Sequence, residues 1–400
     1  MPNDESANKS GHSVPKVLHC HAYFGPQLGT QGVAGQAALK SVQLINAFGA
    51  RLSHSIVSAR GAAIEGRSEI SSLSSVAYPS DFPSLSGWPT LGRLLALAKA
   101  MQGYDLILTY GWEAMDAAMA HTVFGQSMGL APLIHHENGF GPEESGKLKA
   151  SRNWYRRIAL GRAHGLVVSS ERLEAVALQT WYQPIGRVRH INHGIKARNF
   201  SGKRRPDALR RVVKHEGEKW IGAQVDGAID PAALKLLIAS FAPLPQDWHL
   251  VILGEGLSGG AVEEIVREAA AQFDVSHRVH LPGGSPDPAK VMGLFDIFAE
   301  ASTDAQMPDA VLQAMAAGLP IASFDVGDIA ASTAASNAPF LVDPAQPSLL
   351  GVSLDELVEI GDRRAIIGEE NRQHAQSNFD EKAMIDSYRR LYANALGREI

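Results

Sequence analysis

The strongest constraint on the fold is a strand, a glycine-rich turn and a helix that follow one another near the start of the chain. Residues 16–21 (KVLHCH) form a short apolar run of the kind found in strands. The turn that follows, GPQLGTQGVAG, carries glycines at positions 25, 29, 32 and 35, and the helical pattern GQAALKSVQLINAFGA begins at the last of them. This order is typical of the first unit of a parallel sheet in which strands alternate with helices.

The alternation of strands and helices continues along the chain and restarts once. Strand-like runs of the first half lie at 104–110, 131–139, 165–170 and 188–195. After a basic, polar stretch at 196–214, a second series begins with KWIGAQ and continues as far as LPIASFDVG. A chain of 400 residues is long enough for two cores. We therefore expect two α/β domains, each with a parallel, doubly wound sheet.

These patterns predict the division of the chain. We expect a disordered polar leader at 1–14, a Rossmann-like domain at 15–200, a linker at 201–215, a second Rossmann-like domain at 216–378, and a C-terminal helix at 379–400, with a return of that helix to the first domain as one option. The leader has no apolar core of the kind that a signal peptide needs. Because no apolar run reaches the ~18 residues of a membrane span, any membrane contact is expected to be peripheral.

Composition excludes several classes of function. The net charge of −5 provides no overall positive field to attract nucleic acid. The single cysteine, Cys20, excludes a disulfide framework and a cysteine-based zinc site, and it favours the reducing environment of the cytoplasm. His19 and His21 alternate on a strand without evident carboxylate partners, so we expect no metal.

Six ordered blocks resemble the retaining GT-B glycosyltransferases. In the second half these are VILGEG, HRVHLPG and MPDAVLQAMAAGLPIASFDVGD; in the first half they are the glycine turn, HHENGFG and RVRHINHGIKARNF. The resemblance spans residues 14–396 and implies a GT-B fold, in which two Rossmann-like domains enclose a cleft. It also implies transfer of a hexose, with retention, from a nucleotide-diphosphate sugar to a saccharide or lipid-linked acceptor in polysaccharide or glycoconjugate assembly. The donor substrate is then the only small molecule required, and no cofactor is expected.

The acidic residues of the resembling family are replaced in this chain. The family commonly has two acids separated by seven residues. Aligned on AMAAGLP, these positions are Ala305 and Gln313. Asp304 and Asp309 lie close by, but a displacement of one residue in a tight turn moves a side chain by several ångströms, so neither replaces a missing acid automatically.

The cations that hold the donor diphosphate in the family are also missing. The Gly-Arg turn of the family corresponds to Gly222-Ala223, and no Lys or Arg lies between Trp220 and Leu234. Charge-assisted bonds contribute about 1.5–3 kcal/mol each, so their loss weakens donor binding. Losses confined to the chemical residues suit a pseudo-glycosyltransferase that serves an active protein partner as scaffold or regulator. An enzyme with a relocated site, or a sugar site without catalysis, is equally compatible with the sequence.

We expect ligand contacts at strand ends and glycine turns. The donor-binding candidates are Gly29, Gly32, Gly254, Glu255, Gln306, Met307, Pro308 and Gln313. His136 and Glu137 are the catalytic candidates because they end a predicted strand, where ligands gather in open α/β sheets. The alternatives are ligand-free turns for the glycines and Glu255, a backbone-bonded loop histidine for His136, and a solvated loop residue for Glu137.

One helix is unusually basic. Residues 147–162 contain Lys147, Lys149, Arg152, Arg156, Arg157 and Arg162, together with Trp154 and Tyr155. One interpretation is peripheral docking on anionic lipid headgroups, which would bring the protein to a lipid-linked saccharide at the inner face of a membrane. The preferred alternative is an ordinary solvated helix face.

Overall fold

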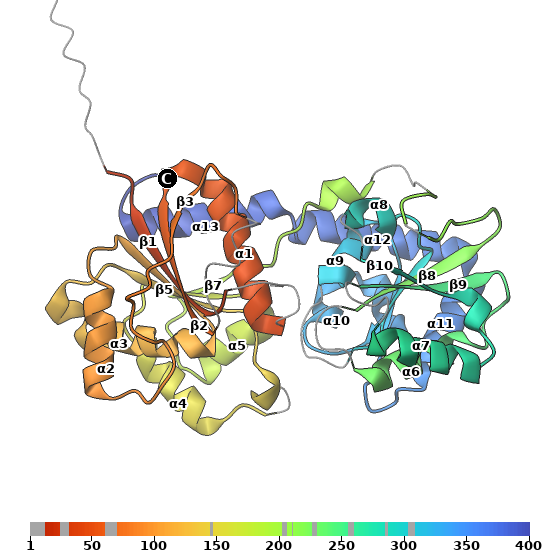
Figure 1. Cartoon of the computed structure of the whole chain (residues 1–400), viewed down its shortest axis with the longest axis horizontal. Coiled ribbons are helices and arrows are strands. Elements are labelled where there is room, and N and C mark those ends of the chain that lie inside the picture. The colour runs from red at the N-terminus through yellow and green to blue at the C-terminus, as the bar shows by residue number, and fades with distance from the viewer. Residues whose placement is uncertain are drawn as a thin grey trace, which may run out of the picture.

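The chain folds into two α/β domains that lie side by side (Figure 1). The structure is a computed structural model, and it describes residues 13–24, 32–60, 70–144, 147–201, 206–209, 211–225, 230–254, 260–284, 287–302 and 309–400. Each domain is built on one fully parallel sheet with helices on both faces. The two-domain Rossmann-like architecture expected from the sequence is therefore confirmed.

The first domain contains a seven-stranded sheet in the order β3-β2-β1-β4-β5-β6-β7. Its strands are β1 (Lys16–Tyr23), β2 (Ser53–Arg60), β3 (Ser75–Ala77), β4 (Leu106–Tyr110), β5 (Leu133–Glu137), β6 (Gly165–Val168) and β7 (Val188–His190). Its helices are α1 (Gly32–Phe48), α2 (Leu91–Ala100), α3 (Met115–Met128), α4 (Ala150–Ala159) and α5 (Glu171–Gln179). Helices α2 to α5 pack on one face of the sheet, whereas α1 packs on the other.

The second domain contains a six-stranded sheet in the order β10-β9-β8-β11-β12-β13. Its strands are β8 (Lys219–Gln224), β9 (Trp248–Leu253), β10 (Val279–Gly283), β11 (Ile297–Glu300), β12 (Ile321–Phe324) and β13 (Leu341–Val342). Its helices are α6 (Pro231–Phe241), α7 (Ala261–Gln272), α8 (Pro288–Met292), α9 (Asp309–Ala316), α10 (Ile329–Ser332), α11 (Leu349–Glu359) and α12 (Gly361–Asn378). Helices α6, α7 and α11 share one core, and α8, α9 and α12 share the other.

Local sequence explains where several helices begin. Ser170 adopts an extended conformation before α5, and its hydroxyl accepts a hydrogen bond from the backbone N–H of Leu173 at 3.2 Å, as expected of a serine cap. Asp230 caps α6 in the same way, and Pro231 occupies the first helical position, where no N–H partner is lost. These caps fix the start of each helix relative to the strand before it.

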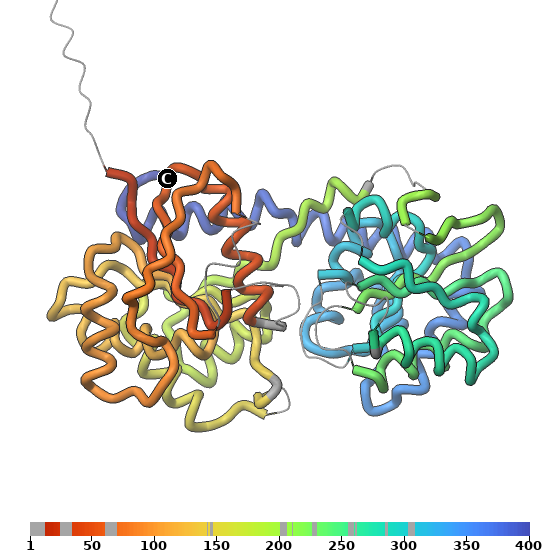
Figure 2. The backbone as a smooth tube through the Cα atoms, viewed as in Figure 1, coloured from red at the N-terminus to blue at the C-terminus, as the bar shows by residue number. Residues whose placement is uncertain are grey.

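The C-terminal helix α13 (Glu381–Leu396) crosses back to the first domain, as the blue trace in Figure 2 shows. The crossing is held by two backbone bonds, from Ile195 N–H to the Phe379 carbonyl (2.8 Å) and from Glu381 N–H to the Ile195 carbonyl (3.0 Å). Tyr388 and Tyr392 of α13 are buried on the same sheet face as α1. Helix α13 therefore completes the first core. Within the described residues, no helix is long and apolar enough to cross a membrane.

Two local features differ from the expectations. The position matched to a Gly-Arg turn lies inside strand β8, which continues to Gln224. Gly222 is needed there because an added Cβ would lie 2.2 Å from the ring of Phe295, and the strand expected at KWIGAQ is present as β8. Leu209, in the stretch 201–215 expected to be a linker, is buried in the core of the second domain, and so is Ala197, which was expected to belong to the first domain.

Candidate functional site

A cavity lies between the two domains at the carboxyl edges of both sheets. About 850 Å³ of space lies between the protein atoms here, and part of it is open to solvent. The first domain contributes Gln36, Lys40, Asn138, Gly139, Phe140, Ser169, Ser170, Arg172, Leu173 and His193, and the second contributes Asp309, Leu312, Asp328, Ser332 and Phe379. Ligands of open α/β sheets bind at this edge, beyond the strand ends.

Lys40 is the cation that α1 directs into the cavity. Its side chain is 3% exposed, and Nζ donates a hydrogen bond to Oδ1 of Asn138 at 3.2 Å. Burial lowers the pKa of Lys40 from 10.5 to about 8, and the nearby charge of Asp309 limits that decrease. An ammonium group has three donors, so Lys40 can bond an anion while it keeps Asn138.

Asp309 is the carboxylate that the second domain directs toward Lys40. It is the first residue of α9, and its Oδ1 lies 3.1 Å from Nε2 of His193, which belongs to the first domain. Burial opposes ionisation of Asp309, but the contact with His193 and the charge of Lys40 outweigh it, so the pKa of Asp309 is lowered. The N-terminus of a helix favours the same charged form.

A second polar contact across the cavity involves Asp328, just before α10. Burial raises the pKa of Asp328, although a hydrogen bond with Ser170 and the charge of Arg172 act in the opposite direction. Ser170 and Arg172 lie at the start of α5, in the first domain. The two domains thus contact each other through two carboxylates of the second domain and basic or polar groups of the first.

The predicted donor-binding residues fall into two groups. Gly29, Glu255, Gln306, Met307 and Pro308 lie outside the described residues. Gly32 begins α1, Gly254 follows β9, and Gln313 lies one turn after Asp309 on α9. The Oε1 atom of Gln313 is buried and, within the described part of the chain, has no hydrogen-bond partner.

His136 does not line the cavity. Its ring is 1% exposed and lies on the face of the sheet that α13 covers. Nδ1 donates to the Thr109 carbonyl at 3.3 Å, which leaves Nε2 to accept from the Tyr392 hydroxyl at 3.2 Å. Burial holds the pKa of His136 well below its usual value, so the ring is neutral. In the part of the chain that the structure describes, the ring of His136 is therefore covered by α13 and does not face the cavity.

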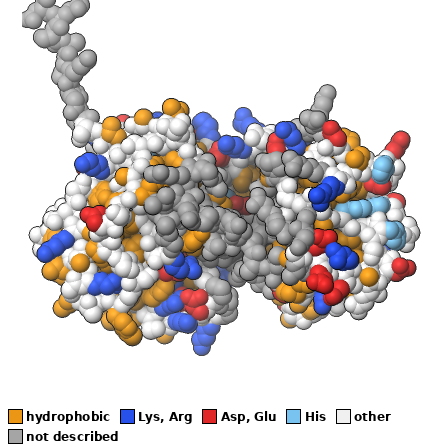
Figure 3. Space-filling view, viewed as in Figure 1, with side chains coloured by type: hydrophobic (Ala, Val, Ile, Leu, Met, Phe, Trp, Pro, Cys, Tyr) orange, Lys and Arg blue, Asp and Glu red, His pale blue; other side chains and the backbone are white. Residues whose placement is uncertain are grey.

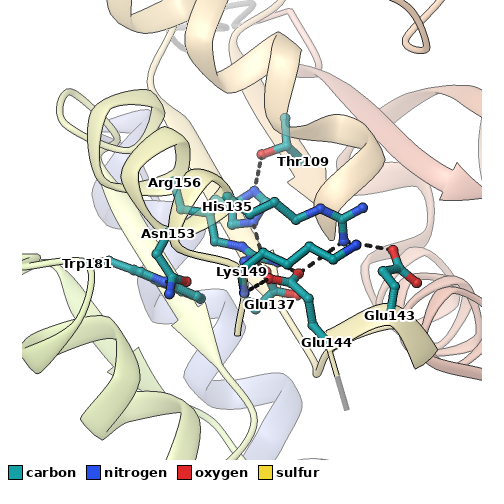
Figure 4. Close-up of polar contacts among 10 residues, drawn as sticks. Thr109, His135, Glu137, Glu143, Glu144, Lys149, Asn153, Arg156 and Trp181 are labelled. Carbon is teal, nitrogen blue, oxygen red and sulfur yellow. Dashed lines mark hydrogen bonds and ion pairs between the residues drawn. The ribbon is translucent and has the colours of Figure 1, made fainter. Parts of the chain in front are cut away.

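Glu137 is also buried away from the cavity, in an ionic cluster shown in Figure 4. Its Oε2 lies 3.6 Å from Nε of Arg156 and 3.9 Å from Nε2 of His135. The sequence placed both catalytic candidates at the end of the correct strand, but both side chains point into the protein. The residue that follows them, Asn138, is the one that reaches the cavity.

The basic helix α4 directs two of its cations inward. Arg156 is 1% exposed, bonds both carboxylate oxygens of Glu144 (3.1 and 2.8 Å), and lies over the rings of Trp112 and Trp181. Arg152 also bonds Glu144, at 3.1 Å. Lys147, Lys149, Arg157 and Arg162 remain exposed. Blue and red side chains are mixed at the lower edge of the first domain in Figure 3.

Sequence reasoning missed the charged residues that do line the cavity: Lys40, Arg172, His193, Asp309 and Asp328. Lys40 offered a signal, because it occupies a position in the helical pattern AALKSVQLI that belongs to the apolar, buried stripe. A charge in such a stripe is rarely buried without a partner or a function. Asp309 was noted only as a neighbour of the replaced acidic positions, and Arg172, His193 and Asp328 offered no comparable pattern.

The fold and the cavity define a GT-B-fold protein, and comparisons with known proteins agree. Residues 207–374, less than half of the chain, match the family model described as Glycosyl transferases group 1. No curated protein matches the chain significantly. The second domain therefore carries the sequence pattern of a glycosyltransferase.

Solved structures resemble the whole chain. HepE from Anabaena, solved with UDP and glucose, is 16% identical with a TM-score of 0.69, and the match covers 95% of this chain and 100% of that one. Sucrose-phosphate synthase from Thermosynechococcus elongatus is 18% identical, with a TM-score of 0.69 and coverage of 96% and 99%. A glycosyltransferase from Rickettsia africae is 15% identical, with a TM-score of 0.71 and coverage of 96% and 99%. Identities this low show the fold alone.

Proposed function

We propose that this protein transfers a hexose, with retention, from a nucleotide-diphosphate sugar to a saccharide or lipid-linked acceptor. The observation that carries the proposal is the buried ammonium group of Lys40, which lies in the cavity between the carboxyl edges of the two sheets. A leaving diphosphate gathers negative charge, and a fixed cation in a site of low dielectric stabilises that charge. The match of the second domain to a glycosyltransferase family and the UDP bound to the similar HepE structure support the same substrate class.

The proposed reaction uses no metal or further cofactor. The bond between the sugar anomeric carbon and the diphosphate oxygen breaks, and the nucleoside diphosphate leaves with the electron pair. An acceptor hydroxyl forms the new bond on the same face of the ring, and its proton passes to the departing phosphate oxygen. Lys40 holds the diphosphate, and Asn138 hydrogen-bonds sugar hydroxyls.

The remaining sequence candidates keep more limited roles in this proposal. Gly29, Gly32, Gly254, Glu255, Gln313 and the segment 306–308 are proposed donor contacts. His136 and Glu137 are proposed to position the end of β5, from which Asn138 enters the cavity. The unpartnered Oε1 of Gln313 suits a sugar or ribose hydroxyl donor, although an amide cannot act as a charged base.

A second candidate function is a pseudo-glycosyltransferase that binds a sugar nucleotide, or a protein partner, without turnover. Ala305 and Gln313 stand where the resembling family has carboxylates, and the carboxylate of Asp309 already contacts His193. Both features favour binding without efficient catalysis.

Calorimetric titration with a panel of nucleotides and nucleotide sugars, followed by a hydrolysis assay, tests these functions. Micromolar donor binding with slow donor hydrolysis supports the transferase. Binding without hydrolysis supports the pseudoenzyme, and no binding of any panel member contradicts both sugar-nucleotide functions. Lys40→Gln is expected to weaken donor binding at least about tenfold. Lys99→Gln, which changes an exposed lysine of α2, is the matched control.

We also propose that helix α4 brings the first domain to an anionic membrane surface. Trp154 is 64% exposed, Ile158 lies one turn further on, and the guanidinium of Arg157 lies 4.4 Å from the ring centre of Tyr182. Exposed apolar side chains beside cations are typical of interfacial helices. Trp154→Ala is expected to reduce co-sedimentation with anionic vesicles, whereas Trp88→Ala, at another exposed tryptophan, is not. Equal sedimentation of the two variants contradicts this contact.

A further inference from the structure

The two walls of the cavity carry opposite charges. Among the described lining residues, the cations Lys40 and Arg172 belong to the first domain, and the carboxylates Asp309 and Asp328 belong to the second. The described lining therefore holds as many carboxylates as Lys and Arg side chains. Among the described lining residues, the Lys and Arg side chains are thus matched in number by carboxylates before any ligand enters.

Asp309 occupies a position that suits an anion. It begins α9, where the positive end of the helix dipole favours negative charge. It accepts from His193 at 3.1 Å and feels the charge of Lys40 from the opposite wall. A helix N-terminus, a ring N–H donor and an ammonium group together are the groups that bind a phosphate. Here they surround a carboxylate that belongs to the protein.

We propose that Asp309 determines the charge specificity of the cavity: its carboxylate takes the place of a ligand's anionic group beside His193 and Lys40. The inference rests on the proposed function, because it concerns the same cavity and the same class of nucleotide ligand. A diphosphate that approaches Lys40 must displace Asp309 from its partners or tolerate its repulsion. Each additional negative charge on the ligand therefore makes the binding free energy less favourable, whereas the carboxylate of Asp309 does not repel a neutral nucleoside or sugar.

The decisive experiment compares ligands of increasing charge on the full chain. Wild type and Asp309→Asn are titrated with uridine, UMP, UDP and inorganic pyrophosphate at low and high salt. We expect Asp309→Asn to bind UDP and pyrophosphate at least about tenfold more tightly than wild type, with uridine unchanged and with the gain reduced at high salt. Asp362→Asn, which removes an exposed carboxylate of α12, is the matched control and is expected to change nothing.

The direction of the change distinguishes this inference from a contact role. If Asp309→Asn binds UDP and pyrophosphate equally or more weakly than wild type, Asp309 does not oppose the anion and the inference is overturned. The double variant Lys40→Gln/Asp309→Asn is expected to lose the tighter binding of UDP and pyrophosphate, because the ligand's anionic group binds Lys40 once the carboxylate of Asp309 is removed. A gain that survives in the double variant contradicts the assigned partner.

Failure of the inference and failure of the proposed function give different results. If wild type binds UDP and Asp309→Asn is no tighter, the function stands and the inference fails. If wild type binds no nucleotide but Asp309→Asn binds pyrophosphate, the inference stands and the function fails. Absence of binding in every protein overturns both.

A measurement without ligand tests the charge contact itself. The pH dependence of Lys40 acetylation, followed by mass spectrometry, reports the pKa of Lys40. Asp309→Asn is expected to lower that pKa further, because the carboxylate limits the effect of burial. An unchanged pKa contradicts the contact, and circular dichroism of each variant verifies that it is folded.

Discussion

Arg156 bonds both carboxylate oxygens of Glu144, with its two terminal nitrogens at 3.1 and 2.8 Å from them. The pair joins α4 to the segment that begins at Asn138, and residues 138–140 of that segment line the cavity. Arg156 also lies beside a second carboxylate, that of Glu137, the last residue of β5. One buried guanidinium therefore connects a sheet strand, a helix and a wall of the site (Figure 4).

We expect Arg156→Met to destabilise the first domain by about 3–5 kcal/mol, because it removes the buried guanidinium beside Glu137 and leaves Glu144 with only Arg152 as a cationic partner. Urea unfolding measures the change. Arg157→Met alters the neighbouring exposed arginine and is expected to cost much less. If the double variant Arg156→Met/Glu144→Met loses less free energy of unfolding than Arg156→Met alone, the pairing of the two residues is supported. Equal losses in Arg156→Met and Arg157→Met would contradict it.

Buried histidines are expected to make the first domain sensitive to acid. Burial lowers the pKa of His21 to about 3 and that of His54 to about 4, and burial holds the pKa of His19 well below its usual value. In the unfolded chain these rings bind protons below pH ~6.5. The unfolded state then binds more protons than the folded state, so stability falls as the pH decreases from about 6.5 toward 3.

His21→Phe tests this pH dependence. The ring of His21 stacks on Tyr110 at 4.0 Å, and neither ring nitrogen has a partner within the described residues. At pH 5 its resistance to protonation costs about 2 kcal/mol, so the phenylalanine variant should gain more stability at pH 5 than at pH 8. Thermal melting over this pH range measures the difference. His277→Gln, at an exposed histidine, is the control; an equal gain for His21→Phe at both pH values would count against the account.

Lys40 is expected to lower stability while it serves binding. Its pKa is about 8 when folded and about 10.5 when solvated, so stability should rise between these values as the pH increases. Lys40→Met should raise the free energy of unfolding at pH 7 by on the order of 1–3 kcal/mol and remove this rise. Chemical denaturation at pH 7 and pH 10 measures the free energy of unfolding at pH 7 and its rise toward pH 10. A destabilised variant at pH 7 would show that the ammonium group is not a buried, costly charge.

Gly194 is expected to be essential for the return of α13. A Cβ atom at this position would lie 2.8 Å from the Cα of Glu381, at the crossing between the two segments. Gly194→Ala should therefore loosen α13 and increase hydrogen exchange across residues 381–396. Gly186→Ala is a close control, because its added Cβ would meet nothing within 4 Å. Similar exchange in the two variants would argue against a tight crossing.

The fold could be predicted from the sequence because its signals are local. The strand, glycine turn and helix near Lys16 and the second series after Lys219 each indicate one parallel sheet, and both sheets are present. Strand β2 and the short strand β3 were not recognised. The need for a glycine at position 222 could not be predicted locally, because the ring of Phe295 that it accommodates lies 73 positions further along the chain.

The site was harder to predict because its chemistry depends on side-chain direction and on contacts across domains. Successive residues of a strand point to opposite faces, so His136 and Glu137 could be placed at the strand end without knowing that both are buried. The contact of His193 with Asp309 joins residues that are 116 positions apart, and no spacing rule connects them. Only Lys40, a cation within an apolar helical stripe, could have been found by pattern alone.

Calorimetry with nucleotide-diphosphate sugars on wild type and Lys40→Gln shows whether Lys40 is the cation that binds the donor diphosphate. We expect saturable binding of at least one donor to wild type in the micromolar range, and binding at least about tenfold weaker to the variant. Equal affinity in the two proteins, or no binding of any donor to wild type, would contradict a diphosphate site at Lys40.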